Sequence, residues 1–295
     1  MDILELDSGD LHLGVLPELG GALAFLRHRQ TDLLRPWDHT PTARRTACYP
    51  LVPYSNRIAW GRMVVEGRQY ELARNFGDHP HSIHGVGWQR PWQVVEQSSA
   101  RCLMRLTHVP DEHWPFAFQA EQTLGLDQHG LSLVMSLRND SAHSMPAGLG
   151  WHPYFPRFAG IELQFDAAAV WLNDQQSLPA ERVAIPPPWQ FAQQREAGYV
   201  ELDNCFEGWV GQARVSWPQS GLELHMEAGP GLNHLVVFTP PQPQDFIAVE
   251  PVSHLNNAIN TPSPEANGIV LLAGGEQIER RLRMNVRQLA AGATA

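Results

Sequence analysis

The segment Gly130-Leu-Ser-Leu-Val-Met-Ser-Leu-Arg-Asn139 decides the fold, because its leucines and methionine recur at every second position. From Leu131 to Leu137 these side chains would share one face of an extended chain, and the intervening residues would share the other. A period of two predicts a strand with one buried face. A similar alternation runs through residues 278–286 near the end of the chain. Both segments favour a β-rich protein.

Turn-forming residues divide the rest of the chain into short pieces. The sequence contains 24 Gly and 24 Pro, scattered along its length, which suits many short strands better than long helices. Residues 62–65 and 69–72 flank Glu66-Gly67 and predict a hairpin. No amphipathic pattern of three helical turns occurs between residues 1 and 285. Further short apolar runs lie at 161–165, 222–226, 235–238, 246–249 and 269–272.

These patterns predict an all-β protein built as a large antiparallel β-sandwich with few short helices. The two Pro-rich segments, 185–189 and 239–245, are short enough to be surface loops within a domain. We therefore predict a single domain over residues 1–295, since β-sandwiches reach this size. The last residues, 290–295, are small and are expected to form a frayed tail.

Composition excludes several classes of protein. The chain has 31 acidic and 21 basic residues, a formal net charge of −10, which argues against nucleic acid or an anionic membrane as a partner. Every basic residue is Arg, and the sequence contains no Lys. Without a lysine amine, Schiff-base aldolase chemistry, pyridoxal-phosphate catalysis and a Walker A loop are all excluded.

The three cysteines, Cys48, Cys102 and Cys205, are widely separated and form no CxxC pair. We therefore expect neither a disulfide framework nor a structural zinc site. The N-terminal residues show no basic region followed by an apolar one, and no run approaches the ~18 apolar residues of a membrane span. These features predict a soluble cytoplasmic protein. They leave its oligomeric state open.

Side chains able to do chemistry concentrate in four segments rich in Gly, Pro and aromatic residues. Each residue type has a common structural role, so no segment decides the function alone. The four segments are Pro53-Tyr-Ser-Asn-Arg-Ile58, His79-Pro-His-Ser-Ile-His-Gly-Val-Gly-Trp88, Gly148-Leu-Gly-Trp-His-Pro-Tyr-Phe-Pro156 and Val249-Glu-Pro-Val-Ser-His-Leu-Asn-Asn-Ala258.

A metal site is one alternative for the second segment. His79, His81 and His84 have a spacing related to the HxH pair of cupins. That arrangement needs a carboxylate a few residues later, and the next acid is Glu96. We therefore expect no metal ion. The sequence also lacks the G-x-S-x-G elbow of α/β-hydrolases.

Taken in order, the segments resemble the aldose 1-epimerase (mutarotase) family, whose fold is the galactose mutarotase-like supersandwich. The resemblance extends over nearly the whole chain, and the ordered set of motifs is more specific than any one of them. The residues that carry it are Ser55-Asn-Arg-Ile58, Gly61, Gly67, Asn75, His84-Gly85, Gly130-Leu131, Asn139, Met145-Pro146, Gly150, His152-Pro-Tyr-Phe155, Leu202-Asp203 and Glu250-Pro251.

The resemblance implies roles for six residues. His152 matches the general acid of the family and Glu250 its general base. Residues matching substrate-binding positions are Asn56, Arg57, His84 and Asp203, the last in a looser local match.

The implied partner is a small sugar, an aldohexose. The family often has a second Gly after the His-Gly pair, whereas Val86 follows here. The sequence therefore leaves the identity of the sugar open.

The implied chemistry is the interconversion of α and β anomers by ring opening and closure. A carboxylate can remove the proton from the O1 hydroxyl while an imidazolium protonates the ring oxygen. We expect the glutamate to be ionised and the histidine protonated, each stabilising the charge of the other. The reaction needs no cofactor. Trp60, Trp88 and Trp151 are candidates for stacking on the sugar, although core packing is the more common role of Trp.

Two alternatives remain. The protein could be a hexose-6-phosphate 1-epimerase of the same fold, whose phosphate would require arginines such as Arg44, Arg45, Arg74 and Arg90. It could instead be a sugar-binding module without catalysis. The presence of both His152 and Glu250 argues against a module, since binding alone needs neither an acid nor a base.

Overall fold

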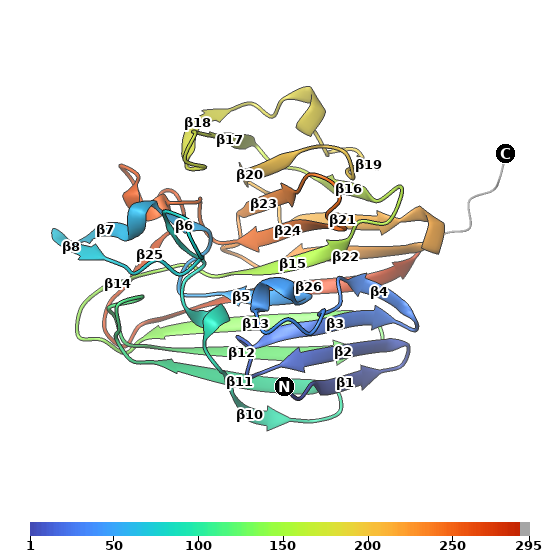
Figure 1. Cartoon of the computed structure of the whole chain (residues 1–295), viewed down its shortest axis with the longest axis horizontal. Helices are drawn as coiled ribbons and strands as arrows, with labels where there is room; N and C mark the ends of the chain where they lie inside the picture. The colour runs from blue at the N-terminus through green and yellow to red at the C-terminus, as the bar shows by residue number, and fades with distance from the viewer. Residues whose placement is uncertain (290–295) are drawn as a thin grey trace.

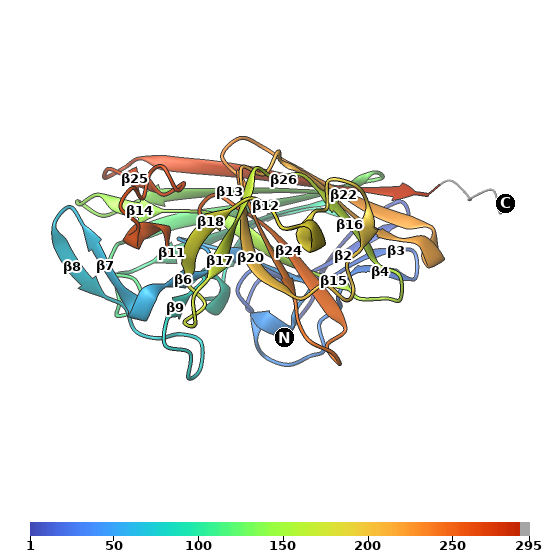
Figure 2. The ribbon, with the colours of Figure 1, turned by 90° about the horizontal axis from the view of Figure 1, so that it is seen from above.

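The computed structural model describes residues 1–289, and two large sheets stacked on one another make up most of it (Figures 1 and 2). The first sheet has eleven strands and the second has nine. In order across the first sheet the strands are β1 (Leu4–Ser8), β2 (Leu11–Leu16), β3 (Ala22–His28), β5 (Cys48–Leu51), β15 (Gly150–Pro156), β24 (Phe246–Val252), β23 (His234–Thr239), β20 (Leu202–Glu207), β17 (Ala169–Asn173) and β18 (Pro179–Val183), with β4 (Thr31–Leu34) paired to β3.

The second sheet covers one face of the first, as the two layers in Figure 2 show. Its strands in order are β10 (Gln93–Gln97), β11 (Arg101–His108), β12 (Phe118–Asp127), β13 (Gly130–Asn139), β26 (Gln277–Gln288), β22 (Leu222–Ala228), β21 (Gln212–Trp217), β16 (Glu162–Phe165) and β19 (Arg195–Glu196).

Three small two-stranded sheets and six 3₁₀ helices of three residues each complete the described chain. The small sheets are β14 (Met145–Ala147) with β25 (Val270–Leu272), β6 (Arg57–Ile58) with β9 (Ser82–Ile83), and β7 (Arg62–Val65) with β8 (Arg68–Glu71). The 3₁₀ helices are η1 (Ala43–Arg45), η2 (Ala59–Gly61), η3 (Gly87–Gln89), η4 (Pro187–Trp189), η5 (Pro218–Ser220) and η6 (Ala258–Asn260).

The predicted all-β sandwich is confirmed. All pairs of neighbouring strands in the two large sheets run antiparallel. The hairpin expected around Glu66-Gly67 is β7–β8, with both turn residues at positive φ. All three cysteines are free and buried. Residues 1–289 contain no helix with the length and apolar character of a membrane span. The expected frayed tail, 290–295, lies outside the described residues.

The sequence pattern of β13 matches its place in the structure. Leu131, Leu133, Met135 and Leu137 are buried, whereas the residues between them are partly or fully exposed. The strand lies between β12 and β26, and its apolar face turns toward the first sheet. This single buried face is the reason that the alternation was visible in the sequence.

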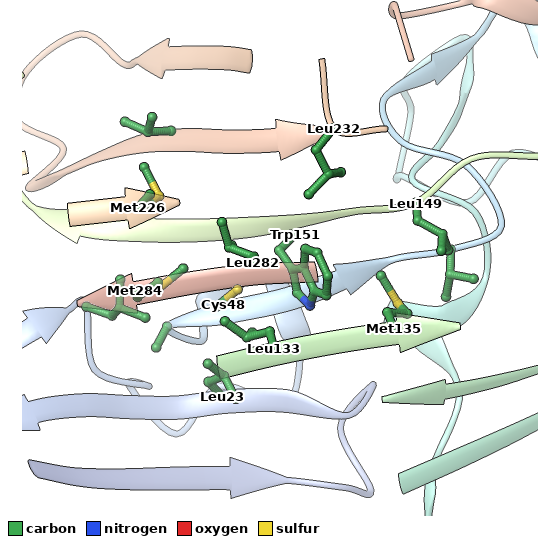
Figure 3. Close-up of a cluster of buried hydrophobic side chains, with 14 of the residues drawn as sticks. Leu23, Cys48, Leu133, Met135, Leu149, Trp151, Met226, Leu232, Leu282 and Met284 are labelled. Carbon is green, nitrogen blue, oxygen red and sulfur yellow. The ribbon is translucent and has the colours of Figure 1, made fainter. Parts of the chain in front are cut away.

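The core lies between the two large sheets, and Figure 3 shows its central part. Leu133 and Met284 from the second sheet lie there with Leu23 and Trp151 from the first. The indole Nε1 of Trp151 donates a hydrogen bond of 2.9 Å to Oε1 of Gln122, on β12 of the opposite sheet. The indole ring of Trp151 is therefore packed in the core, and its N–H group has a hydrogen-bond partner.

Strands β15 and β24 are buried on both faces, and the side chains on one of those faces belong to the candidate site. Every residue of both strands is buried. Trp151 and Val249 pack in the core between the sheets. Because successive side chains of a strand point to opposite faces, His152, Tyr154 and Glu250 lie on the outer face of the first sheet.

Candidate active site

A cleft of about 500 Å³ opens on the outer face of the first sheet. The segments before and after η1 and before β9, blue and cyan in Figure 2, project from the side of this sheet that faces away from the second. Aromatic rings contribute to the wall, among them Tyr49, Phe76 and Tyr154. The structure brings all six residues expected at the site to this cleft: Asn56, Arg57, His84, His152, Asp203 and Glu250.

His152 and Glu250 come from neighbouring central strands. The pairing of β15 with β24, Gly150 opposite Val252 and Tyr154 opposite Ala248, places His152 directly across from Glu250. His152 Nε2 lies 3.2 Å from Glu250 Oε1. Both side chains are almost fully buried, so an imidazole and a carboxyl group meet at the floor of the cleft with little access to bulk water.

Burial sets the protonation of this pair. Burial, together with a smaller contribution from the positive charge of Arg35, lowers the pKa of His152 to about 3. Burial also raises the pKa of Glu250 well above its ordinary value, and the negative charge of Asp203 adds to that rise. The expected ion pair is therefore disfavoured in the empty cleft. A neutral Glu250 carboxyl group beside a neutral His152 imidazole carries the same number of protons as the ion pair. The neutral and ionised forms of the pair therefore differ only by the transfer of one proton between two side chains that lie 3.2 Å apart.

Two tyrosines hold the His152 ring in place. Tyr49, opposite His152 in the pairing of β5 with β15, stacks on the imidazole with 4.7 Å between ring centroids. Tyr154 lies on the same face two residues further along β15, with its ring 4.4 Å from that of His152. Neither tyrosine was among the residues expected at the site. Tyr154 lies within the His-Pro-Tyr-Phe motif, whereas Tyr49 carries no sequence signal beyond its strand.

His84 is held by reciprocal hydrogen bonds with Asn56. The backbone N–H of Asn56 donates to His84 Nδ1 over 3.0 Å, and the backbone N–H of His84 donates to the Asn56 carbonyl over 2.9 Å. Burial lowers the pKa of His84 well below its ordinary value. A neutral ring that accepts at Nδ1 carries its proton on Nε2. His84 is thereby prepared to donate a hydrogen bond into the cleft.

The glycine after His84 is required by the local backbone. Gly85 has φ of 67°, and a Cβ there would collide with the carbonyl of Val52. His84 itself has φ of 62°, which is unusual for a residue with a side chain. The close approach of this turn to Val52 explains the His-Gly pair physically, and it fixes the direction of the imidazole.

Arg57 and Asp203 form an ion pair at the edge of the cleft. Arg57 Nη2 lies 3.0 Å from Asp203 Oδ2, and Asn56 Oδ1 accepts from both the backbone N–H and Nη1 of Arg57. Asp203 is on β20, three strands from β15 in the sheet. These contacts hold the guanidinium in one plane, where its remaining donors can meet oxygen atoms of a ligand.

Comparison with known proteins identifies the family. Residues 2–285 match the model of the aldose 1-epimerase family. The chain belongs to this family. It is 31% identical to the protein YphB of Escherichia coli K12, over 98% of this chain and all of that protein. Galactose mutarotase of Sus scrofa is 29% identical over 44% of this chain and 40% of its own.

Solved structures agree with this assignment. A crystal structure from Escherichia coli K12 superposes with a TM-score of 0.92 at 31% identity, covering 98% of this chain and 99% of the other. A galactose mutarotase-like protein from Clostridium acetobutylicum gives 0.85 at 16% identity, covering 97% and 95%. The second shows a shared fold. The family resemblance expected from the sequence is confirmed.

None of the three tryptophans considered for sugar stacking lines the cleft of this aldose 1-epimerase family member. Trp151 lies in the core between the sheets, and Trp88 packs behind the cleft against Tyr49. Trp60 is on the surface beside His81. The apolar surface of the cleft is instead supplied by Tyr49, Phe76, Tyr154, Phe238 and Phe246.

The histidines of the second segment have separate partners. His81 Nδ1 accepts from the backbone N–H of Trp60, and its Nε2 lies 2.9 Å from the Gln176 carbonyl. His79 lines the cleft, whereas His84 is bound to Asn56. Within residues 1–289, no group of three or more His, Cys, Asp or Glu side chains is placed to hold a metal ion.

The four arginines proposed for a phosphorylated substrate separate into two pairs. Arg44 and Arg45 line the cleft. Arg74 lies in a different surface groove, and Arg90 forms an ion pair with Asp111. Arg35, which no motif singled out, also lines the cleft. The position of Arg35 depends on the conformation of the connection after β4, which short sequence patterns do not predict.

Proposed function

We propose that this protein is an aldose 1-epimerase that interconverts the α and β anomers of an aldose. The observation that carries the proposal is the approach of His152 Nε2 to Glu250 Oε1 at the floor of the cleft. Anomer interconversion needs proton transfer at two oxygens bonded to the same carbon, O1 and the ring oxygen. An acid and a base placed side by side on neighbouring strands suit that geometry.

The proposed reaction begins when the Glu250 carboxylate takes the proton of the O1 hydroxyl. The electron pair of that O–H bond forms the C1 carbonyl, the bond from C1 to the ring oxygen breaks, and the His152 imidazolium protonates the ring oxygen. Rotation about the C1–C2 bond presents the other face of the aldehyde. Closure then reverses both transfers, so the enzyme returns to its starting protonation state.

The active form of the pair requires one proton to pass from Glu250 to His152. Burial opposes this transfer in the empty cleft, as the pKa shifts of both groups show. Sugar hydroxyls that donate hydrogen bonds to the carboxylate would stabilise its charged form. Substrate binding would therefore help to create the acid and the base that act on the substrate.

The other expected residues would bind the sugar. His84, with its proton on Nε2, would donate to a ring or hydroxyl oxygen. Arg57 would donate through the guanidinium N–H groups not used by Asn56 and Asp203, and Asp203 would accept from hydroxyls. The aromatic wall would cover the apolar C–H faces of the sugar.

The test is the rate of anomer interconversion measured by polarimetry on freshly dissolved α-glucose and α-galactose. Glu250→Gln and His152→Asn should each lower kcat by about 10²–10⁴, the usual contribution of a positioned proton-transfer group. Glu223→Gln is the matched control, because Glu223 is also a buried carboxyl group but bonds Ser216 on the second sheet. If both cleft variants keep the wild-type kcat, the assigned roles are wrong. If the wild type itself does not exceed the spontaneous rate, a sugar-binding module becomes the better interpretation.

A further inference from the structure

Two arginines give one end of the cleft an excess of positive charge. Arg35 follows β4, and Arg44 belongs to η1; both line the cleft, and we call them the arginine end. Neither lies within 4 Å of a carboxylate in the described chain, in contrast to Arg57 and Arg45, which pair with Asp203 and Asp38. The excess occurs in a protein of net charge −10. Two unpaired cations at the edge of a polar cleft are the usual setting of an anion site.

Arg35 is fixed in place with donor capacity left over. Its Cζ lies 3.9 Å from the centroid of the Tyr154 ring and 4.5 Å from that of Phe246. Nη2 donates to the backbone carbonyls of Arg44 and Thr46, over 2.8 and 2.9 Å. Nε is buried and has no hydrogen-bond partner, and Nη1 makes no hydrogen bond within residues 1–289. The guanidinium is thus rigid before any ligand arrives, which reduces the entropic cost of binding.

Arg44 reaches the cleft from the same segment. Its Cζ lies 4.2 Å from the centroid of the Phe76 ring, and that ring is 6.3 Å from the ring of His84. The side chain is otherwise exposed. Because Arg35 binds the backbone carbonyl of Arg44, the two cations are tied to one another through η1. Both side chains line the same cleft.

The arginine end lies on the side of the cleft nearer to His152. Arg35 stacks on Tyr154, whose ring is also 4.4 Å from the His152 ring, so one aromatic ring separates the guanidinium from the proposed acid. Under the proposed function, His152 protonates the ring oxygen of the sugar. That oxygen is bonded to C5, and C5 carries C6. A substituent on C6 therefore extends from the reacting unit toward the His152 side.

Resting on the proposed epimerase function, we propose that the natural substrate is an aldose with an anionic group on C6, bound by Arg35 and Arg44. The shared chemistry is a phosphate ester or a carboxylate. The anion would also act on the proposed acid, since the charge of Arg35 contributes to the lowered pKa of His152. An anion beside Arg35 would offset that charge and so favour the imidazolium.

The experiment compares three substrates: glucose, glucose 6-phosphate and glucuronate. Anomer exchange is followed by magnetisation-transfer NMR of the anomeric protons, with the spontaneous rate subtracted. The wild type should have a higher kcat/KM for one or both anionic sugars than for glucose. Arg35→Gln and Arg44→Gln should each reduce kcat/KM for the preferred anionic sugar by about 10- to 100-fold, the effect of losing a charge-assisted hydrogen bond. The kcat/KM for glucose should fall less in both variants. Preference between phosphate and carboxylate identifies the anion.

Arg74→Gln is the matched control, because Arg74 is exposed, has no carboxylate within 4 Å in the described chain, and lies in another groove. It should leave the kinetics of all three substrates unchanged. If the wild type prefers glucose, or if Arg35→Gln and Arg44→Gln reduce activity on glucose as much as on the anionic sugars, the anion site is overturned while the epimerase function stands.

Binding measured without turnover separates failure of the anion site from failure of the epimerase function. 1,5-Anhydroglucitol 6-phosphate and the corresponding 6-carboxylate cannot open their rings, and calorimetry should show that at least one of them binds at least about tenfold more tightly than 1,5-anhydroglucitol. The difference should disappear in the Arg35→Gln, Arg44→Gln double variant. Equal affinities in the wild type would refute the site even if turnover were observed. A persistent difference without turnover of any aldose would instead refute the epimerase function.

Discussion

The two faces of the first sheet, built from the same strands, differ in every property that matters for function. The inner face of β15 and β24 carries Trp151 and Val249, packed against the second sheet, with the Trp151 N–H satisfied by Gln122. The outer face carries His152 and Glu250, also buried, but held at the floor of an open cleft. Residue parity along a strand therefore separates the groups that stabilise the fold from those placed to do chemistry.

The outer face contains polar atoms that the protein leaves without partners. Glu250 Oε2, His152 Nδ1 and Arg57 Nε are buried and make no hydrogen bond within the described chain. Such groups lower stability, because they lose contact with water without replacing it. These three atoms belong to residues that line the cleft, where polar atoms of a bound ligand would complete their hydrogen bonding.

The largest expected effect separates activity from stability on the outer face. Glu250→Gln should reduce kcat by about 10²–10⁴, yet it should not lower the free energy of unfolding, because a neutral amide is easier to bury than an ionisable carboxyl group. Paired measurements of anomer exchange and urea denaturation check this. A loss of stability as large as the loss of activity would show that Glu250 supports the fold.

The inner face should give the opposite result. Trp151→Ala should cost about 3–5 kcal/mol of unfolding free energy, since it removes a fully buried indole from the core. Trp151→Phe keeps most of the apolar contact but leaves Oε1 of Gln122 without its hydrogen-bond donor. This substitution should cost about 1–3 kcal/mol of unfolding free energy. Chemical denaturation gives both values. If Trp151→Ala were as stable as the wild type, the inner face would not be the main support of the fold.

Acid should destabilise the protein through buried neutral histidines. Burial lowers the pKa of His234 and of His254 to about 4. His254 is satisfied as a neutral ring, since its Nε2 accepts from the Ser55 N–H and its Nδ1 lies 2.8 Å from the Leu255 carbonyl. Below the unfolded value near 6.5, the unfolded chain binds more protons at these residues, so the free energy of unfolding falls as pH falls from 6.5 toward 4.

The expected slope is roughly 1 kcal/mol per pH unit for each such histidine. Protonation of Glu250 changes the free energy of unfolding in the opposite direction, because its pKa is raised in the folded protein. It therefore offsets part of the decrease in stability. Urea denaturation at pH 7, 6 and 5 gives the net slope. His254→Gln should make the slope shallower; constant stability from pH 7 to 5 would contradict the prediction.

The smallest expected effect concerns Asp203, whose half-buried position makes its contribution modest. Asp203→Asn removes the negative charge that pairs with Arg57 and should lower kcat/KM by about tenfold. The same charge also helps to raise the pKa of Glu250. The alkaline limb of the pH–rate profile should therefore move to lower pH. An unchanged profile would show that Asp203 does not act on the acid–base pair.

The sequence predicted the fold best where strands are covered on one side. The alternation in β13 and β26 was visible because solvent reaches their other face. In β15 and β24 both faces are buried, so the period of two disappears, and these strands were found as motifs or apolar runs. The hairpin at Glu66-Gly67 was predictable from local turn chemistry alone.

The residues that line the cleft were predictable where they lie in ordered motifs. His152, Glu250, His84 and the Asn56-Arg57 pair each lie in a short segment that resembles the family. Arg35 gave no such signal, because its position depends on how the connection after β4 folds back against Tyr154. The neutral state of His152 and Glu250 also could not be foreseen, since it depends on burial that only the folded sheets produce.

The proposed acid and base lie on central strands, whereas most proposed ligand contacts lie on connections or short elements outside them. His152 and Glu250 are fixed by the pairing of β15 with β24. Arg35, Arg44 and His84 lie in segments that could be exchanged without altering that pairing. Under the proposed function, natural divergence or laboratory evolution can therefore change which sugar is accepted by replacing loops, while the proposed acid and base are inherited intact.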